Sequence, residues 1–332
     1  MFATLRVLLA TSLAVAAACA AAQSADPGAA EAEATLSAVV RVKARILPDA
    51  RTVQSLGARR EGTGILVREG YVLTIGYLVI EAEAIEVTAA DGKAAPATLA
   101  AYDHATGFGL LKLVAPLSGK PLPLGDSAAL AERDAAMVVG YGGREALNLV
   151  TVVSRRSFSG SWEYLLDAAI FTYPPVHNWS GAALISARGE LLGVGSLIVP
   201  DAGGPGTQSP GNLFVPIDLL KPVLDDLIAH GRAAGPTRPW LGLNAEELRG
   251  RLFVSRVSPE GPADRAGLRG GDLLLAVGGE EVASLADFYR KVWARGAAGA
   301  EIPLRVLQGS QLKELRVRSI DRLEYFRRKP TY

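Results

Sequence analysis

The feature that most constrains the fold of this chain is a succession of short apolar runs between about residues 36 and 216, each closed by a turn rich in glycine or proline. The strand-like runs are 64–67, 71–74, 84–87, 109–113, 136–140 and 191–199. Runs this short and this closely spaced favour strands over helices. The pattern predicts a mainly β architecture, an antiparallel barrel or sandwich, with residues 201–212 as a surface loop.

The last third of the chain has a different pattern. Residues 218–230 place their leucines and Val223 on one stripe and are followed by Gly231, which predicts a helix. Residues 232–239 read as a linker, and a second domain of about ninety residues follows. Its expected elements are strands at 252–254 and 273–277, a helix over 284–294 and a closing hairpin over 301–318.

The first 22 residues are typical of a secretory signal peptide. Arg6 supplies the positive charge, residues 7–18 are apolar, and Ala20–Ala22 fits a cleavage site. Residues 23–35 are small and polar and are expected to form a flexible leader. The chain is therefore predicted to be exported to the periplasm; the alternative is a lipoprotein anchored to the membrane at Cys19, the only cysteine.

Composition excludes several classes of function. The formal net charge is +1, which gives no reason to expect a nucleic-acid partner, and the basic residues within 326–332 are interpreted as a solvated tail. No histidines, cysteines or carboxylates have the spacing of metal ligands, and no glycine-rich loop has the spacing that holds phosphate. We therefore expect neither a metal nor a cofactor.

Two sets of motifs carry a family resemblance. The segments WLGL (240–243) and SPEGPADRAGLRGGDLLLAVGGEEV closely resemble the PDZ domain of HtrA/DegP-type periplasmic proteins. Upstream, GTGILVREGYVLTIGYLVI and NLFVPIDLLKPVLDDLIAHG resemble the trypsin-like protease domain of the same family. The resemblance implies a trypsin-like double β-barrel over residues 36–235, a PDZ domain (a small β-barrel with helices) over 236–325, and a homo-oligomer.

Compared motif by motif, the family's catalytic triad is incomplete in this chain. The position of the general-base histidine holds Tyr77, the position of the orienting aspartate holds Gly107, and the nucleophile is present as Ser180. Asn178 replaces the glycine whose amide serves the oxyanion hole. Loss of a triad histidine lowers turnover by about a million-fold, or about 8 kcal/mol of transition-state stabilisation. A phenol titrates near pH 10, so Tyr77 is a poor base.

Three histidines could in principle replace the missing base. His177 lies three residues before Ser180, His104 follows Asp103, and His230 ends the predicted helix. Adjacent strand residues point to opposite faces, which argues against an Asp103–His104 pair, and His230 suits a helix C-terminus. His177 is the remaining alternative, and an active serine endopeptidase using Ser180 with a non-standard base is the rival interpretation.

The PDZ-like part keeps its binding equipment. The amides of Leu241, Gly242 and Leu243 are expected to hold a C-terminal carboxylate, while Phe288 and Val292 line the groove. Trp240 is either a peptide contact or a side chain packed between the domains. We therefore predict an inactive protease homologue that binds peptide or protein C-termini, or unfolded envelope proteins, as a scaffold, chaperone-like or regulatory factor in protein quality control.

Overall fold

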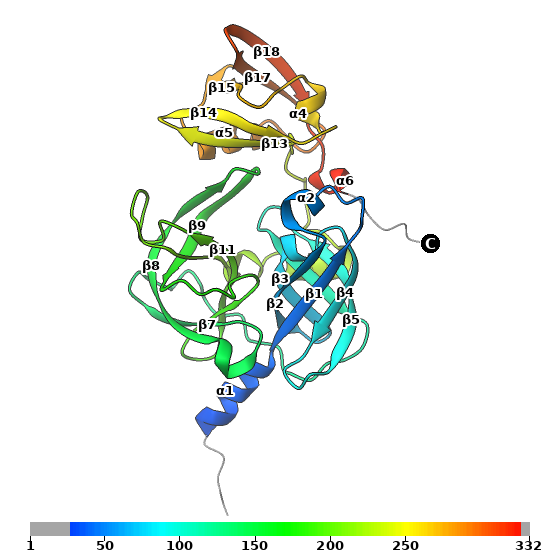
Figure 1. Ribbon diagram of the computed structural model, residues 1–332, viewed down its shortest axis with the longest axis vertical. Helices are drawn as coiled ribbons and strands as arrows, with labels where there is room; N and C mark the ends of the chain where they lie inside the picture. The colour runs from blue at the N-terminus through cyan, green and yellow to red at the C-terminus, as the bar shows by residue number, and fades with distance from the viewer. Residues whose placement is uncertain (1–26, 327–332) are drawn as a thin grey trace, which may run out of the picture.

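The computed structural model describes residues 27–326 and shows two β-barrels side by side, with a third domain stacked on one end of the pair (Figure 1). The chain is mainly β, as predicted from its short apolar runs. The expected signal peptide, residues 23–26, Cys19 and the basic residues 327–329 lie outside the described residues.

The first barrel is closed and antiparallel, in the strand order β1-β2-β3-β6-β5-β4. Its strands are β1 (Val39–Ile46), β2 (Arg59–Arg68), β3 (Tyr71–Ile75), β4 (Ala82–Thr88), β5 (Ala94–Tyr102) and β6 (Phe108–Leu113). Short helices α2 (Val53–Leu56) and η1 (Gly76–Leu78) lie in its connections. Alternating residues of β1 are buried, which is the pattern expected of a strand with one face on the core.

The second barrel is also closed, in the order β10-β11-β12-β9-β8-β7. Its elements are β7 (Ala135–Val139), η2 (Gly143–Ala146), β8 (Leu147–Gly160), β9 (Tyr164–Tyr173), β10 (Ala183–Ile185), β11 (Leu191–Val199) and β12 (Gly211–Pro216). The β8–β9 hairpin is long, and its tip rises out of the barrel toward the third domain (Figure 1). The expected surface loop ends earlier than predicted, because residues 211 and 212 belong to β12 and Asn212 is buried.

The third domain, expected to be a small β-barrel with helices, is a six-stranded sheet in the order β13-β14-β15-β17-β18, with β16 paired to β15. Its elements are β13 (Leu243–Leu248), β14 (Arg251–Val257), α4 (Pro262–Arg265), β15 (Leu273–Val277), β16 (Glu280–Glu281), α5 (Leu285–Trp293), β17 (Glu301–Gln308) and β18 (Gln311–Arg318). The strand β13 lies at the edge of this sheet. After β18 the chain returns toward the first barrel and forms α6 (Arg322–Tyr325) (Figure 1).

Two helical segments differ from expectation. Residues 27–35, expected to be flexible, form most of α1 (Pro27–Ser37), because alanine and glutamate have high helix propensity. The helix predicted over 218–230 is divided into η3 (Ile217–Leu219) and α3 (Leu224–His230). Pro222 lies between them and lacks the N–H that a continuous helix requires.

Candidate functional site

Ser180 lies in the loop between β9 and β10, where the two barrels meet. Its carbonyl accepts a hydrogen bond of 2.8 Å from the amide of Thr63 in β2. The next residue, Gly181, has φ +76°, and a Cβ there would lie 2.0 Å from the carbonyl oxygen of Thr63. Only glycine permits this close approach. The loop is therefore fixed against the first barrel, with the hydroxyl of Ser180 held at the boundary between the barrels.

Tyr77 is the hydrogen-bond partner of that hydroxyl. It lies in η1, directly after β3, and its Oη is 2.8 Å from Oγ of Ser180 and 2.9 Å from the carbonyl oxygen of Ser196 in β11. A carbonyl oxygen can only accept, so the single phenolic proton of Tyr77 is donated to Ser196. Ser180 must then donate its own proton to Oη of Tyr77.

The protonation state of Tyr77 decides what this contact can do. Burial raises the pKa of Tyr77 to about 12, and its hydrogen bond with Ser180 offsets only part of that rise. At pH 7 the phenolate form would then be about one molecule in 10⁵, equivalent to about 7 kcal/mol. The neutral phenol accepts a hydrogen bond from Ser180 but has no useful affinity for its proton.

Gly107 lies in the turn before β6 and is held by two backbone hydrogen bonds of 2.7 Å. Its amide donates to the carbonyl of Asp103, and its carbonyl accepts from the amide of Gly76. The backbone of Gly107 has φ +81°, and a Cβ would lie 3.3 Å from the hydroxyl of Tyr164. This hydroxyl is itself bonded to the carbonyl of Thr106 at 2.5 Å. The space that a longer side chain at position 107 would enter is thus bounded by Tyr164.

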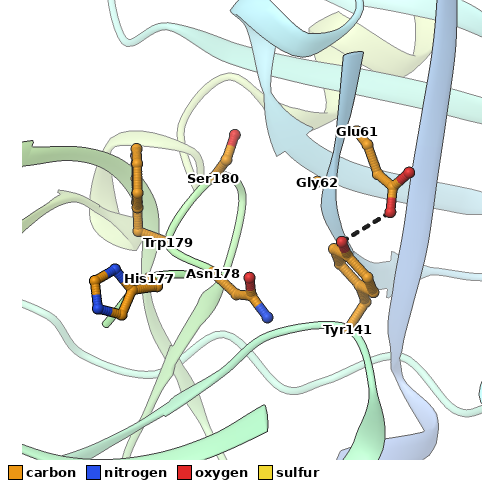
Figure 2. A pocket seen from close by; sticks show the side chains of 7 residues that line it. All are labelled: Glu61, Gly62, Tyr141, His177, Asn178, Trp179 and Ser180. Carbon is orange, nitrogen blue, oxygen red and sulfur yellow. Dashed lines mark hydrogen bonds between the residues drawn. The ribbon is translucent and has the colours of Figure 1, made fainter. Parts of the chain in front are cut away.

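None of the three histidines is bonded to Ser180 in the described part of the chain. His177 is exposed, and its imidazole lies away from the Ser180 hydroxyl, on the other side of the base of Trp179 (Figure 2). Nδ1 of His104 is 3.0 Å from Nη1 of Arg322, and burial together with Arg322 lowers the pKa of His104 well below 6.5. His230 is exposed at the end of α3, with Nδ1 3.9 Å from Asp226.

The Asp103 carboxylate does not face His104 either. Oδ1 of Asp103 accepts from the amide of Ala105 at 3.2 Å, and Oδ2 accepts from the hydroxyl of Thr106 at 2.6 Å. These bonds shape the turn before Gly107. The structure therefore does not join Asp103 and His104 as an acid–base pair.

A shallow pocket of about 250 Å³ lies beside Ser180. Its lining residues are Glu61, Gly62, Tyr141, His177, Asn178, Trp179 and Ser180 (Figure 2). The hydroxyl of Tyr141 donates to Oε1 of Glu61 at 2.8 Å, and Arg41 is paired with the same carboxylate at 2.7 Å. Although burial alone would raise the pKa of Glu61, these two partners lower it, so this wall of the pocket is a neutralised ion pair.

The predicted carboxylate-binding amides of the third domain are occupied by a side chain of the second barrel. Glu163 lies in the turn between β8 and β9. Its Oε2 accepts from the amide of Leu241 at 2.8 Å, and its Oε1 accepts from the amides of Gly242 and Leu243 at 2.7 and 3.1 Å. Gly242 has φ +80°, and successive amides around such a residue converge on one anion.

The other predicted groove residues lie around this contact. Phe288 and Val292 of α5 are each 1% exposed and belong to the same apolar cluster as Leu241 and Leu243. Trp240 is also buried, with its ring centroid 4.7 Å from that of Tyr325, and this favours the packing interpretation of its side chain.

The sequence does not single out three residues of this region: Ser196, Glu163 and Asn212. The buried Asn212 accepts from the amide of Val176 at 2.6 Å and donates to the carbonyl of the same residue at 3.1 Å, which fixes the start of the Ser180 loop. The only available signal was the position of Asn212 at the start of an apolar run. Ser196 contributes through its backbone, and Glu163 sits in an unremarkable turn, so neither carries a local sequence signature.

Two further findings limit the kinds of site. Within residues 27–326 no group of three or more histidine, cysteine, aspartate or glutamate side chains could hold a metal ion. In the same part of the chain, every helix is too short or too polar to cross a bilayer.

Comparison with known families matches both parts of the molecule. Residues 62–194 match the model of the trypsin-like peptidase domain, and residues 239–318 match the model of the PDZ domain. The fold also resembles the crystal structure of the serine endoprotease from Yersinia pestis (TM-score 0.54, 23% identity, covering 89% of this chain and 98% of that one). The HtrA-type protease AlgW with decapeptide is similar at a TM-score of 0.55 and 23% identity, covering 92% of this chain and all of the other.

Curated relatives point the same way. The chain is 27% identical over 277 residues to a probable periplasmic serine protease do/HhoA-like from Haemophilus influenzae, covering 77% of this chain and 57% of the relative. It is 26% identical over 309 residues to the serine endoprotease DegS of Escherichia coli K12, covering 84% of this chain and 82% of DegS. The chain spans only about half the length of the first relatives that it matches.

These matches define a protein in which a trypsin-like peptidase domain is followed by a PDZ domain. Within that class the chain is HtrA/DegP-like, a homologue of the HtrA-family periplasmic serine proteases.

Proposed function

We propose that this chain is a pseudoprotease of the HtrA type, which binds peptide or protein C-termini through its PDZ domain and does not hydrolyse peptide bonds at Ser180. The observation that carries the first part is the contact between Tyr77 and Ser180. The phenolic proton of Tyr77 is directed to the carbonyl of Ser196, so Ser180 donates to a neutral phenol instead of to a base.

The magnitudes support an inactive site. A triad without its histidine is slower by about a million-fold. Recruiting the phenolate of Tyr77 would itself require about 7 kcal/mol at pH 7 for a pKa near 12. Position 107, where the family has the orienting aspartate, is glycine and offers no carboxylate to Tyr77. We infer that Ser180 acts as a hydrogen-bonding group of the loop rather than as a nucleophile.

The second part of the proposal concerns the PDZ domain. The amides at Leu241–Leu243 already hold a carboxylate, that of Glu163, which supports their capacity to hold the C-terminus of a peptide. The solved HtrA-type relative AlgW is described with a decapeptide. The occupants that we propose here are C-termini of peptides or of unfolded envelope proteins, with the protein acting as a scaffold or chaperone-like factor.

We place this activity in the periplasm. Relatives are named periplasmic, and the expected signal peptide would export the chain. Mass spectrometry of the mature N-terminus separates signal-peptide cleavage after residue 22 from a lipid-modified Cys19. A mass that corresponds to a diacylglyceryl group on Cys19 would mean that the protein is anchored to the membrane and is not free in the periplasm.

The deciding experiment is labelling by a serine-directed fluorophosphonate probe, together with cleavage of unfolded casein, for the wild type and for Ser180→Ala. We expect neither labelling nor cleavage above the Ser180→Ala baseline. Turnover that disappears in Ser180→Ala would mean that another base activates Ser180. His177→Ala would then be the next variant, because the rival endopeptidase interpretation uses that imidazole.

A further inference from the structure

The β8–β9 turn supplies more than a carboxylate to the PDZ domain. The carbonyl of Ser161 accepts a hydrogen bond of 3.0 Å from the amide of Ala245 in β13, and the Ser161 hydroxyl is 3.3 Å from Nδ2 of Asn244. Strand β13 is the edge of its sheet, and an edge strand is where an extended peptide adds to a PDZ domain. The turn therefore bonds to the backbone that a peptide ligand would use.

The same turn also supplies an apolar side chain. Leu165, in β9, is 7% exposed and packs in the PDZ core cluster with Leu241, Phe288 and Val292 rather than in the core of its own barrel. These are residues expected to line the groove. A carboxylate, a backbone carbonyl and an apolar anchor are the three features by which PDZ domains recognise a C-terminus, and residues 161–165 provide all three.

Helix α5 holds the turn in place from the other side of the groove. The hydroxyl of Tyr289 donates to the carbonyl of Gly160 at 2.7 Å and accepts from the amide of Glu163 at 3.1 Å. Tyr289 is 1% exposed. The Tyr289 hydroxyl thus hydrogen-bonds to the backbone of the turn at two positions.

The contact carries internal strain. Glu163 has φ 59°, a left-handed conformation that is unfavourable for a residue with a Cβ. Glu163 is 2% exposed, and the hydrogen-bond partners of its carboxylate are three amides rather than a cation. A buried carboxylate without a cation partner is less stable than the same group in water. The docked turn is therefore weakly held, and a peptide that binds the same amides more favourably can displace it.

We propose that the β8–β9 turn is an internal ligand of the PDZ groove, with the Glu163 carboxylate in the place of a peptide C-terminus, so that an incoming peptide with a free C-terminal carboxylate binds only by displacing it. This regulation rests on the proposed function, since it concerns the same groove. A tethered ligand acts at an effective concentration in the millimolar range. The apparent affinity for peptide is lowered by the fraction of molecules in which the groove is open.

The test is fluorescence anisotropy with a labelled decapeptide that ends in an apolar residue with a free carboxylate, and with its C-terminal amide as the reference probe. The full chain without its expected signal peptide is titrated at pH 7 as wild type and as Glu163→Ala. We expect Glu163→Ala to bind the carboxylate peptide about 10- to 100-fold more tightly, and the amide peptide weakly in both.

A matched control is Asp167→Ala. Asp167 lies on the same strand as Leu165 and pairs with Arg290 of α5 at 2.6 Å, but both side chains are exposed and outside the groove. We expect its peptide affinity to stay within about two-fold of the wild type. Tyr289→Phe removes the hydroxyl that holds the turn and keeps the ring, so it should raise peptide affinity without touching the carboxylate.

Amide hydrogen exchange at Leu241, Gly242 and Leu243 reports on the internal ligand without any peptide. In Glu163→Ala these amides should exchange at least ten-fold faster, and in Asp167→Ala at the wild-type rate. Equal peptide affinity in wild type and Glu163→Ala, with unchanged exchange, would overturn the internal ligand and leave peptide binding intact. Faster exchange without peptide binding to either protein would instead overturn the proposed peptide-binding function.

Discussion

The Ser180 site and the PDZ groove are both closed by the protein's own side chains, but in different ways. On the proposed function, Tyr77 occupies the position of the general base and is hydrogen-bonded to the Ser180 hydroxyl. In the PDZ groove all three amides are present and are covered by Glu163 from another domain. The first is a change of chemical groups. The second is a change of occupancy, which a competing ligand can reverse.

The difference has a thermodynamic meaning. In the described residues the Ser180 hydroxyl is hydrogen-bonded to Tyr77, whose pKa burial raises to about 12, and His177 of the same loop lies away from that hydroxyl (Figure 2). Releasing Glu163 needs only the separation of a turn from a groove, and the groove amides then become available. We therefore expect activity at the first site to resist single substitutions and affinity at the second to respond to them.

The largest expected effect tests the first half of that comparison. Tyr77→His restores an imidazole at the base position but leaves Gly107 unable to orient it. A triad without its acid loses about 10⁴-fold in turnover, so casein cleavage by Tyr77→His should fall short of a complete triad by at least that factor. Initial rates should be measured with Tyr77→His/Ser180→Ala as the blank. A rate within ten-fold of an active HtrA-type protease would break the comparison.

The second prediction uses the ionisation of Glu163. Burial raises its pKa to about 7, against its ordinary value near 4.5, even though the amides of Leu241, Leu243 and Gly242 and the charge of Arg322 favour the ionised form. Docking of the turn is therefore coupled to the uptake of a proton by Glu163. The resulting stabilisation of the docked turn is fully present below pH 4.5 and is lost as the pH rises through 7.

Peptide affinity of the wild type should accordingly rise by about 10- to 100-fold between pH 5 and pH 8, measured by anisotropy. The other groups facing Glu163 are the guanidinium of Arg322 and the hydroxyl of Tyr289, and burial raises the pKa of Tyr289 well above this range. Glu163→Gln is the control and should give a flat profile. An equal slope in Glu163→Gln would assign the titration to another group.

The smallest effect concerns stability at the altered triad position. Gly107→Asp places a Cβ at φ +81° and 3.3 Å from the Tyr164 hydroxyl. Left-handed strain and crowding together should destabilise the protein by about 2 kcal/mol, seen as a lower Tm. Gly92→Asp is matched in φ, at +84°, but has nothing within 4 Å. The smaller destabilisation expected for Gly92→Asp measures the left-handed strain alone. Equal destabilisation of the two variants would show that Tyr164 does not crowd position 107.

Much of the fold followed from the sequence. The short apolar runs predicted six of the twelve barrel strands, namely β2, β3, β4, β6, β7 and β11. The tetrapeptide at 240–243 with the segment after it predicted the PDZ domain. The helix over 218–230 was too long in prediction because the stripe of leucines was given more weight than Pro222. Residues 27–35 were predicted to be flexible because they are small and polar. They form most of the helix α1 instead, because alanine and glutamate have high helix propensity.

The sequence by itself determined the identity of the groups at each site: Ser180, Tyr77 and Gly107 at the positions where the resemblance implies a triad, and a run of amides around Gly242. Identity is local, so motif order is enough to read it. Only the tertiary structure decided which groups meet. The acceptor of the Tyr77 proton is a backbone carbonyl 119 residues away, and the carboxylate on the Leu241 amide comes from 78 residues away. Such contacts arise when separately patterned domains dock, and neither contact could be predicted because no periodicity or spacing rule encodes that docking.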